Sequence, residues 1–466
     1  MRGEDMILDA FNNEMSRRRV RLHGAVLFKG GKVIEEIYRP PYSRSEKTRM
    51  YSSSKSVTAL AIGKLIGEGR LSLKTKLIDI FKDRFDMSSA DPILYEQTVE
   101  HMLKMTTVYS TATYSEKNRD WLRSYFRGKA THPAGTLWHY DSCGSYVLGA
   151  VVKHITGMDF VEYLRPEFDL IGVSDGVFCL KGPDGEAWSS SGFIATTSDL
   201  ARIAYLFLNG GEWDGQQLIP RDYALAAISP LVTNHERGII TRYCCGYGYQ
   251  IWSHPDGAFA FRGLGGQIAI GFPDRDLVFA CNCDTASNAT TYDDVFDSVE
   301  SVILPHFPKK DGGVCNKAQK STEKQLSVSD VKDVTYKMEE NPMGIEEIRF
   351  EGSEREAKLL FTQHGEERVI EFSTERETVG KFPIAYTGSP LFSEDDFMQY
   401  RTSTSAEWVE PRKLLIRVWA EDLYVGNLAM FFYFTDDERL AVATNKHAQF
   451  YFNEFSGYAY GKAVIE

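Results

Sequence analysis

Tyr51-Ser52-Ser53-Ser54-Lys55-Ser56 opens an apolar stretch that continues as Val57-Thr58-Ala59-Leu60-Ala61-Ile62-Gly63-Lys64-Leu65-Ile66. The stretch predicts a buried helix that ends near Gly67 or Gly69, since glycine suits a left-handed helix end. Ser52 and Lys55 are three residues apart, so they share one helix face within hydrogen-bonding reach. Serine needs a base to attack a carbonyl, and lysine can be that base when burial or nearby positive charge lowers its pKa. The run therefore predicts a nucleophile and its base.

An ordinary helix start is the alternative interpretation of the same residues. Ser52 to Ser54 would then cap the helix, and Lys55 would lie in solvent. The same spacing recurs at Ser321–Lys324 and Ser329–Lys332, in a polar stretch that cannot bury a lysine. Only the pair at Ser52 heads a hydrophobic helix, so the rest of the chain has to decide between the two interpretations.

Composition limits the classes of partner. At 466 residues the chain exceeds a usual single domain, and its 43% hydrophobic and 25% charged content is ordinary for a globular protein. A net charge of -12 argues against nucleic acid or an anionic membrane as partner, because both would repel the chain. The acidic start lacks the apolar core of a signal peptide, and no run approaches a membrane span, so we expect a cytoplasmic location.

Seven cysteines, at positions 143, 179, 244, 245, 281, 283 and 315, are consistent with reduced thiols in a chain of this length. Cys244-Cys245 and Cys281-Asn282-Cys283 lack the spacing and the companion histidines of a zinc site. We therefore expect neither a metal nor a cofactor.

Periodicity predicts several elements around the Ser52 helix. We expect an amphipathic helix over 6–21, a β-hairpin at 25–29 and 32–38, and helices over 145–156, 199–209 and about 293–304. Strands over 247–252, 259–270 and 277–281 suggest an antiparallel meander. Gly263, Gly265 and Gly266 fall inside the second strand, where they would let another backbone or a ligand approach closely.

The composition and the hydrophobic pattern of the sequence change near residue 309. Residues 309–325 look like a linker, and 326–466 read as a mostly β domain, a barrel or sandwich, with strands at 414–420, 428–434 and 440–444. The predicted organisation is a first domain over 1–308, the linker, and a C-terminal domain over 326–466 in which we identify no chemistry.

Three ordered motifs resemble those of the serine β-lactamase and penicillin-binding-protein superfamily. They are Ser52-Ser53-Ser54-Lys55, Tyr140-Asp141-Ser142 after a Pro-Ala-Gly-Thr turn, and the glycine-rich stretch from Phe261 to Gln267. The resemblance covers roughly residues 15–305 and is greatest to the branch related to class C β-lactamases, which includes esterases, D-aminopeptidases and aminohexanoate-oligomer hydrolases. It implies an α+β fold in which helices flank an antiparallel sheet and a mostly helical subdomain faces it.

The resemblance also implies roles for individual residues. Ser52 would be the acylated nucleophile, Lys55 the proton acceptor, and Tyr140 the phenol that moves protons and activates the deacylating water. The backbone N–H groups of Ser52 and Leu264 would hold the oxyanion. Tyr140 could instead be a packed aromatic residue with a satisfied hydroxyl.

Candidate substrate-binding residues are Ser142, Arg262 and Gly263. Ser142 stands where lactamases usually have asparagine, and it could equally make a local turn hydrogen bond. The triplet Phe261-Arg262-Gly263 replaces a Lys-Thr-Gly type motif that binds the β-lactam carboxylate, and alternation along a strand would point Arg262 away from the face of its two neighbours. Carboxylate-bearing lactams are therefore doubtful substrates.

These observations favour a cytoplasmic serine esterase or amidase that acts on a small ester or amide. A non-catalytic binding or sensor protein with the same fold is the main alternative, and a β-lactamase or D-amino-acid peptidase is the second. The residues fix neither the acyl group nor the oligomeric state. Four aromatic residues of the helical region, Tyr109, Tyr114, Trp121 and Tyr125, could line a pocket or pack in the core.

Overall fold

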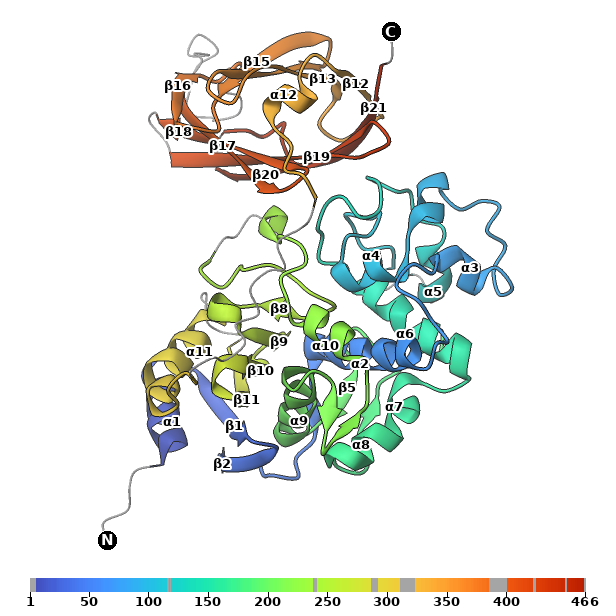
Figure 1. The fold of residues 1–466 in the computed structure, drawn as a ribbon, viewed down its shortest axis with the longest axis vertical. Helices are drawn as coiled ribbons and strands as arrows, with labels where there is room; N and C mark the ends of the chain where they lie inside the picture. The colour runs from blue at the N-terminus through green and yellow to red at the C-terminus, as the bar shows by residue number, and fades with distance from the viewer. Residues whose placement is uncertain are drawn as a thin grey trace.

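The computed structural model describes residues 6–114, 117, 119–237, 241–285, 292–310, 323–384, 400–421, 425–448 and 451–464. It shows a larger N-terminal domain of helices and a sheet, with a β-rich C-terminal domain above it (Figure 1). Most of the predicted linker, residues 311–322, lies outside the described residues, so the three domain boundaries stay predictions.

An antiparallel sheet forms the centre of the N-terminal domain. Its described strands, in spatial order, are β2 (Lys32–Tyr38), β1 (Arg21–Lys29), β11 (Leu277–Asp284), β10 (Gln267–Phe272), β9 (Phe259–Gly263) and β8 (Trp252–Ser253). The predicted hairpin is confirmed as β1 and β2, joined at Gly30 and Gly31, which both adopt positive φ. The predicted meander is confirmed as well, with two corrections. The strand predicted over 247–252 is wrong for most of its length, because only the short β8 is a strand and Tyr247 forms an isolated bridge.

The prediction of one strand over 259–270 is wrong. The segment forms two antiparallel strands, with Gly263 opposite Gln267. Gly265 and Gly266 have φ angles of 89° and 105°, a region that glycine enters without a steric penalty, and they turn the chain between the strands. These two glycines therefore serve the turn itself.

Helices cover both faces of the sheet. On one face α1 (Ile7–Arg17) and α11 (Asp293–Ser298) form a core with the strands through Phe11, Val295 and Phe296. On the other, α9 (Thr197–Leu208) and α2 (Ser54–Gly67) share a core with Phe259 and Phe261. The remaining helices of this domain are α3 (Leu77–Phe81), α4 (Val99–Lys104), α5 (Trp121–Tyr125), α6 (Ser142–Thr156), α7 (Phe160–Tyr163), α8 (Arg165–Ile171) and α10 (Arg221–Ala227), and its short strands are β3 (Thr48–Arg49), β4 (Phe178–Cys179), β5 (Phe193–Ala195), β6 (Glu212–Trp213) and β7 (Gln216–Gln217).

The C-terminal domain is a separate antiparallel sheet that curls nearly into a barrel, as the sequence predicted (Figure 1). Its core is filled by side chains, among them Phe350, Phe432 and Phe434. The described strands, in spatial order, are β15 (Glu366–Phe372), β14 (Ala357–Gln363), β13 (Ile345–Gly352), β12 (Thr335–Met338), β21 (Gly457–Ala463), β20 (Arg439–Ala448), β19 (Val425–Phe434), β18 (Lys413–Glu421), β17 (Arg401–Glu410) and β16 (Thr378–Lys381), preceded by α12 (Val328–Val331).

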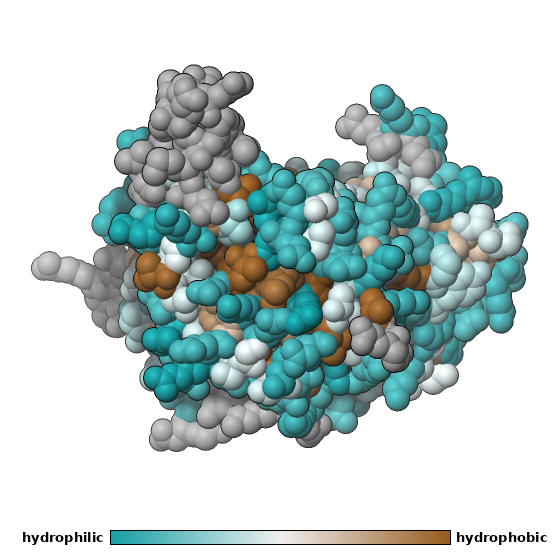
Figure 2. All heavy atoms as spheres, turned by 90° about the horizontal axis from the view of Figure 1, so that it is seen from above, coloured by the Kyte–Doolittle hydropathy of each residue, from teal (hydrophilic) through white to brown (hydrophobic). Residues whose placement is uncertain are grey.

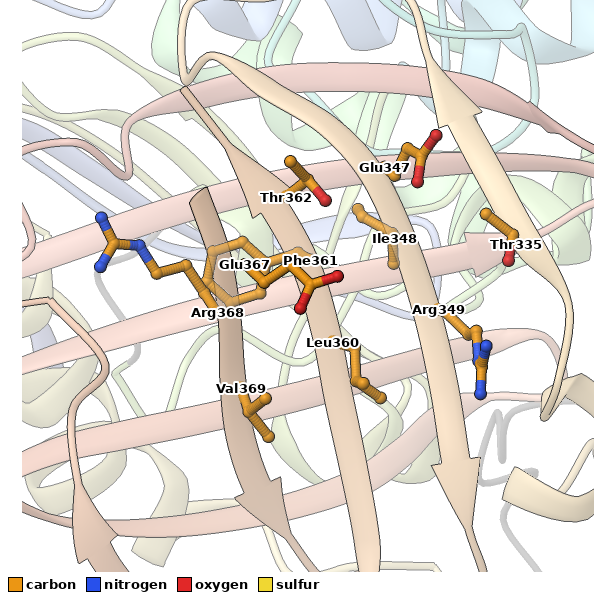
Figure 3. Close-up of a pocket in the computed structure, with 10 residues that line it drawn as sticks. All are labelled: Thr335, Glu347, Ile348, Arg349, Leu360, Phe361, Thr362, Glu367, Arg368 and Val369. Atoms are coloured by element: carbon orange, nitrogen blue, oxygen red, sulfur yellow. The ribbon is translucent and has the colours of Figure 1, made fainter. Parts of the chain in front are cut away.

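The outer end of the C-terminal domain carries no predicted site residue. Seen from above it is mostly hydrophilic, with a narrow apolar band (Figure 2). A depression of about 150 Å³ on β12 to β15 mixes side chains of both charges, such as Glu347 and Arg349 (Figure 3). Among the described residues, no helix has both the length and the apolar character needed to cross a membrane.

Candidate functional site

The chain enters α2 through a constrained turn. Tyr51 has a φ of 45°, an uncommon conformation for a bulky residue, and it begins the 3-10 turn Tyr51–Ser53. Hydrogen bonds tie the residues before this turn to β5 and to the loop that precedes it. The Met50 N–H donates to Phe193 O at 2.8 Å, and the Arg49 guanidinium donates to Ser191. The turn therefore holds Ser52 at a fixed place at the head of a buried helix.

The neighbouring serines have structural hydrogen bonds. Ser53 Oγ donates to Gln267 O at 2.7 Å, Ser54 Oγ to Tyr51 O at 2.5 Å, and Ser56 Oγ to Gln250 O at 2.8 Å. Ser52 differs, because its Oγ accepts a hydrogen bond from Lys55 Nζ at 3.2 Å. No side-chain capping bond is found at the start of the turn or of α2, so these serines do not act as the ordinary cap.

Lys55 is buried, with only 2% of its surface exposed. Its Nζ donates to Ser190 O at 2.7 Å as well as to Ser52. Burial lowers the pKa of Lys55 to about 7, although the nearby carboxylate of Asp141 opposes the shift. A large fraction of the amine is therefore neutral near pH 7, and only the neutral form can accept the proton of a serine hydroxyl.

Tyr140 comes from the segment that precedes α6. Its ring centroid lies 5.0 Å from Lys55 Nζ, and its ring stacks on Trp252 with centroids 5.6 Å apart and planes at 22°. The residue is thus both packed, as the alternative interpretation had it, and in contact with the buried amine. The structure brings Ser52, Lys55 and Tyr140 together.

Asp141 is a site residue that the sequence reasoning passed over. Its carboxylate caps α6 by accepting from the Gly144 N–H at 2.8 Å, and it also accepts from Thr107 Oγ1 at 2.9 Å. Burial raises the pKa of Asp141, while these donors act in the opposite direction. An aspartate directly before a helix is a recognisable capping signal, so its position could have been found from the sequence.

The two proposed oxyanion donors lie where β9 meets the start of α2. A Cβ added to Gly263 would stand 2.3 Å from Met50 O, so only glycine allows the strand to approach the turn that contains Ser52 this closely. Leu264 follows it with a side chain that is 68% exposed. No hydrogen bond of the Leu264 N–H is found within the described residues, so this donor has no acceptor in the part of the chain that the structure describes.

Arg262 is not brought to Ser52. It lies opposite Ile268 in the ladder, on the sheet face covered by α11, and its guanidinium lies 4.9 Å from the centroid of the Phe296 ring. Its Nη2 lies 2.6 Å from His254 Nε2 and donates to Tyr243 O at 2.9 Å. Strand alternation therefore turns Arg262 away from the face of Phe261, as the sequence suggested.

Ser142 is the first residue of α6 and is half-buried. Its side chain makes no hydrogen bond that the described residues show, so the turn hydrogen bond considered from the sequence is not found there. Its position next to Asp141 leaves a substrate-binding role as a prediction.

Aromatic residues of the helical subdomain divide into two groups. Tyr109 and Tyr125 are buried in the core, where Tyr109 Oη donates to Tyr125 O at 2.6 Å. Tyr114 and Trp121 stack on each other with centroids 4.3 Å apart, and Trp121 meets Trp188 edge to face at 5.5 Å. Of the two groups, only Tyr114 and Trp121 extend to the loop of Trp188 and Ser190. The carbonyl oxygen of Ser190 accepts the hydrogen bond from Lys55 Nζ.

Comparisons with known proteins identify the family and the fold. The family model described as Beta-lactamase matches residues 11–298. The 6-aminohexanoate-dimer hydrolase of Paenarthrobacter ureafaciens is 21% identical over an alignment of 223 residues, and the match covers 44% of this chain and 56% of that protein. The chain thus matches only about half the length of this curated relative.

Two solved structures resemble both domains together. SurE has a TM-score of 0.54 at 16% identity and covers 98% of each chain. The octameric penicillin-binding protein homologue from Pyrococcus abyssi has a TM-score of 0.51 at 15% identity and covers 98% of this chain and 99% of its own. At these identities the likeness shows a shared fold, including the C-terminal sheet domain. The family match and the hydrolase relative together support a serine hydrolase in general.

Proposed function

The chain belongs to the beta-lactamase family, and we propose that it hydrolyses a small ester or amide through a covalent acyl-enzyme at Ser52. The observation that carries the proposal is the buried amine of Lys55, 3.2 Å from Ser52 Oγ, with a pKa of about 7. A binding protein has no need of a basic group in contact with a serine hydroxyl.

In the first half of the reaction, Ser52 Oγ attacks the substrate carbonyl carbon while its proton passes to Lys55 Nζ. The N–H groups of Ser52 and Leu264 stabilise the oxyanion that forms. The bond to the leaving alkoxide or amine then breaks, and that group takes the proton with the help of Lys55 and Tyr140. An acyl ester on Ser52 remains.

In the second half, water attacks the acyl ester. Its proton passes to the Tyr140 and Lys55 pair, the bond to Ser52 Oγ breaks, and Ser52 regains its proton as the acid leaves. The support for Tyr140 in this step is that its ring centroid lies 5.0 Å from Lys55 Nζ, so the residue that carries the phenol contacts the amine.

The proposed substrate feature is the lack of a carboxylate at the place where the family motif would supply a cation. Neither Phe261 nor Gly263 offers a cation on the site face of β9, and Arg262 faces the other side. The hydrolase relative, whose name specifies an aminohexanoate dimer, makes an amide as reasonable as an ester. A β-lactamase or D-amino-acid peptidase is the less favoured candidate, and the cytoplasmic location stays a prediction.

Intact-mass spectrometry after exposure to a fluorophosphonate, and separately to p-nitrophenyl acetate, tests the proposal. We expect one adduct on Ser52 that is absent in Ser52→Ala and forms more slowly in Lys55→Ala. Ser329→Ala and Lys332→Ala are the matched controls, since they have the same spacing on the exposed α12 region and should react as the wild type does. No adduct, or one that persists in Ser52→Ala, would leave the binding-protein alternative in front.

A further inference from the structure

The segment that leads into Tyr140 lies against the C-terminal domain. Leu137 is fully buried in an apolar cluster whose other members come from the outer face of β18 to β20: Leu415, Ala429, Phe431, Ala441 and Ala443. An apolar side chain from one domain thus completes a core on the surface of the other. Burial of this kind stabilises the contact in proportion to the apolar surface area that it removes from water.

Trp138 is held through a buried ion pair that crosses the domain interface. Its backbone N–H donates to Glu236 Oε1 at 3.3 Å, and the same oxygen accepts from Lys413 Nζ at 2.7 Å. The side chains of Glu236 and Lys413 are both 0% exposed. Burial raises the pKa of Glu236, and Lys413 opposes that shift. Removal of Lys413 would leave the carboxylate buried without its counter-charge, so the pair fixes the position of Glu236 and with it Trp138.

Tyr458 of β21 holds the next peptide. Its hydroxyl lies 3.4 Å from both Trp138 O and His139 Nδ1, and its ring stacks on His132 with centroids 5.1 Å apart. The C-terminal domain therefore contacts three consecutive residues, Leu137 to His139, immediately before Tyr140. The Trp138 indole is also within 5.8 Å of Trp252, on which the Tyr140 ring stacks.

We propose that the C-terminal domain sets the position of Tyr140, with Lys413 and Tyr458 as positioning residues. The inference rests on the proposed function, because Tyr140 must take part in proton transfer for its position to matter. The geometry gives two routes, one along the backbone from Trp138 to Tyr140 and one through the stacked ring of Trp252. A residue misplaced by about 1 Å in a proton-transfer site can lose a large part of its rate contribution.

A second contact between the domains provides a matched control. The Arg439 guanidinium donates to both carboxylate oxygens of Glu96, at 3.0 and 2.8 Å, so this pair also links β20 to the N-terminal domain. It makes no contact with residues 137–140 among the hydrogen bonds of the described residues. Arg439→Gln should weaken the interface without moving Tyr140.

The experiment compares full-length Tyr458→Phe, Lys413→Met, Lys413→Arg and Arg439→Gln in steady-state and burst hydrolysis of p-nitrophenyl acetate. We expect Tyr458→Phe and Lys413→Met to lower kcat about tenfold with little change in KM, because the phenol acts on the chemical steps rather than on binding. Lys413→Arg should restore most of kcat, since it returns the positive charge. Arg439→Gln should keep the wild-type kcat, even if its unfolding midpoint falls as far as the midpoints of Tyr458→Phe and Lys413→Met.

The two proposals fail in different ways. A wild type that forms no Ser52 adduct with the fluorophosphonate refutes the proposed function before the variants are compared. A wild type that forms the adduct, together with Tyr458→Phe of unchanged kcat, refutes the positioning role. Equal losses in Arg439→Gln and Tyr458→Phe would also refute it, because they would show a general effect of a weakened interface. Tyr458→Phe retains the ring on His132, so the test does not depend on whether Lys413→Met folds.

Discussion

Replacement of Lys55 by methionine should remove activity and stabilise the fold at the same time. Methionine has a similar length and no charge, so it can occupy the buried site with little repacking. The acyl-transfer step would lose its base. The folded protein would lose a group whose charged form is disfavoured by burial, which is why loss of function and gain of stability are expected together.

The size and the pH range of the stability effect follow from the pKa. The pKa of Lys55 falls from 10.5 to about 7 on folding. This shift corresponds to a loss of at most about 5 kcal/mol in the free energy of unfolding. Below pH 7 the amine is charged in both states and the folded protein has the full penalty. Between pH 7 and 10.5 the unfolded chain binds more protons at this residue, so the stability of the wild type rises with pH. Lys55→Met has no such rise.

Urea denaturation of both proteins at intervals from pH 6 to pH 10 measures this difference. The gap in unfolding free energy should be largest at pH 6, with the variant more stable, and should narrow as pH increases. In parallel, the burst rate of p-nitrophenol release by the wild type should rise with pH through a midpoint near 7 and be absent in the variant. If the two unfolding curves run parallel over this range, Lys55 has an ordinary pKa in the folded state, and the reasoning on its role as a base is refuted.

Three further substitutions test single contacts at the site. Tyr140→Phe keeps the ring on Trp252 but loses the hydroxyl, so kcat for p-nitrophenyl acetate should fall about 10² to 10⁴-fold; full turnover would exclude the phenol from the reaction. Leu264→Pro removes the proposed oxyanion donor and should lower kcat about 10² to 10³-fold, whereas Leu264→Ala, which keeps the N–H, should leave kcat unchanged; equal rates in both would place the donor elsewhere. Asp141→Ala removes the cap of α6 and should cost about 1–2 kcal/mol in urea denaturation, more than Asp159→Ala, because Asp159 precedes α7 without a capping bond; the reverse order would contradict the capping argument.

Local pattern was enough to predict the elements that form the site. The apolar run after Ser52 has no polar face, which predicts a helix buried on all sides, and α2 is one. Its spacing places Ser52 and Lys55 on one face regardless of what surrounds them. Tyr140 and the glycine-rich motif were assigned to the site from the order of the motifs and not from any local property. Their positions beside Lys55 and beside the start of α2, respectively, were therefore inferred from the resemblance.

Other features depend on contacts that no local pattern contains. The turn at Gly265 and Gly266 was taken as part of a strand, because both neighbouring segments have the same β preference and only the register distinguishes them. No chemical role could be predicted for the C-terminal domain from its sequence. Its relation to the site depends on Lys413 meeting Glu236 and Tyr458 meeting Trp138, across 177 and 320 residues of chain. Pairings at such distances follow from how two folded domains fit together.

Strand β9 differs from the family motif that binds a carboxylate. This difference argues that the substrate is recognised by shape more than by charge. Phe261, at the position where the family has its carboxylate-binding cation, is fully buried and meets Phe207 edge to face at 5.9 Å. A lysine in that place would bury a charge among apolar side chains, which costs several kcal/mol without a partner. Arg262 already contacts His254 and Tyr243 on the opposite face. A single exchange on this strand therefore cannot restore a carboxylate site, which supports the proposal of a substrate without a carboxylate at that position.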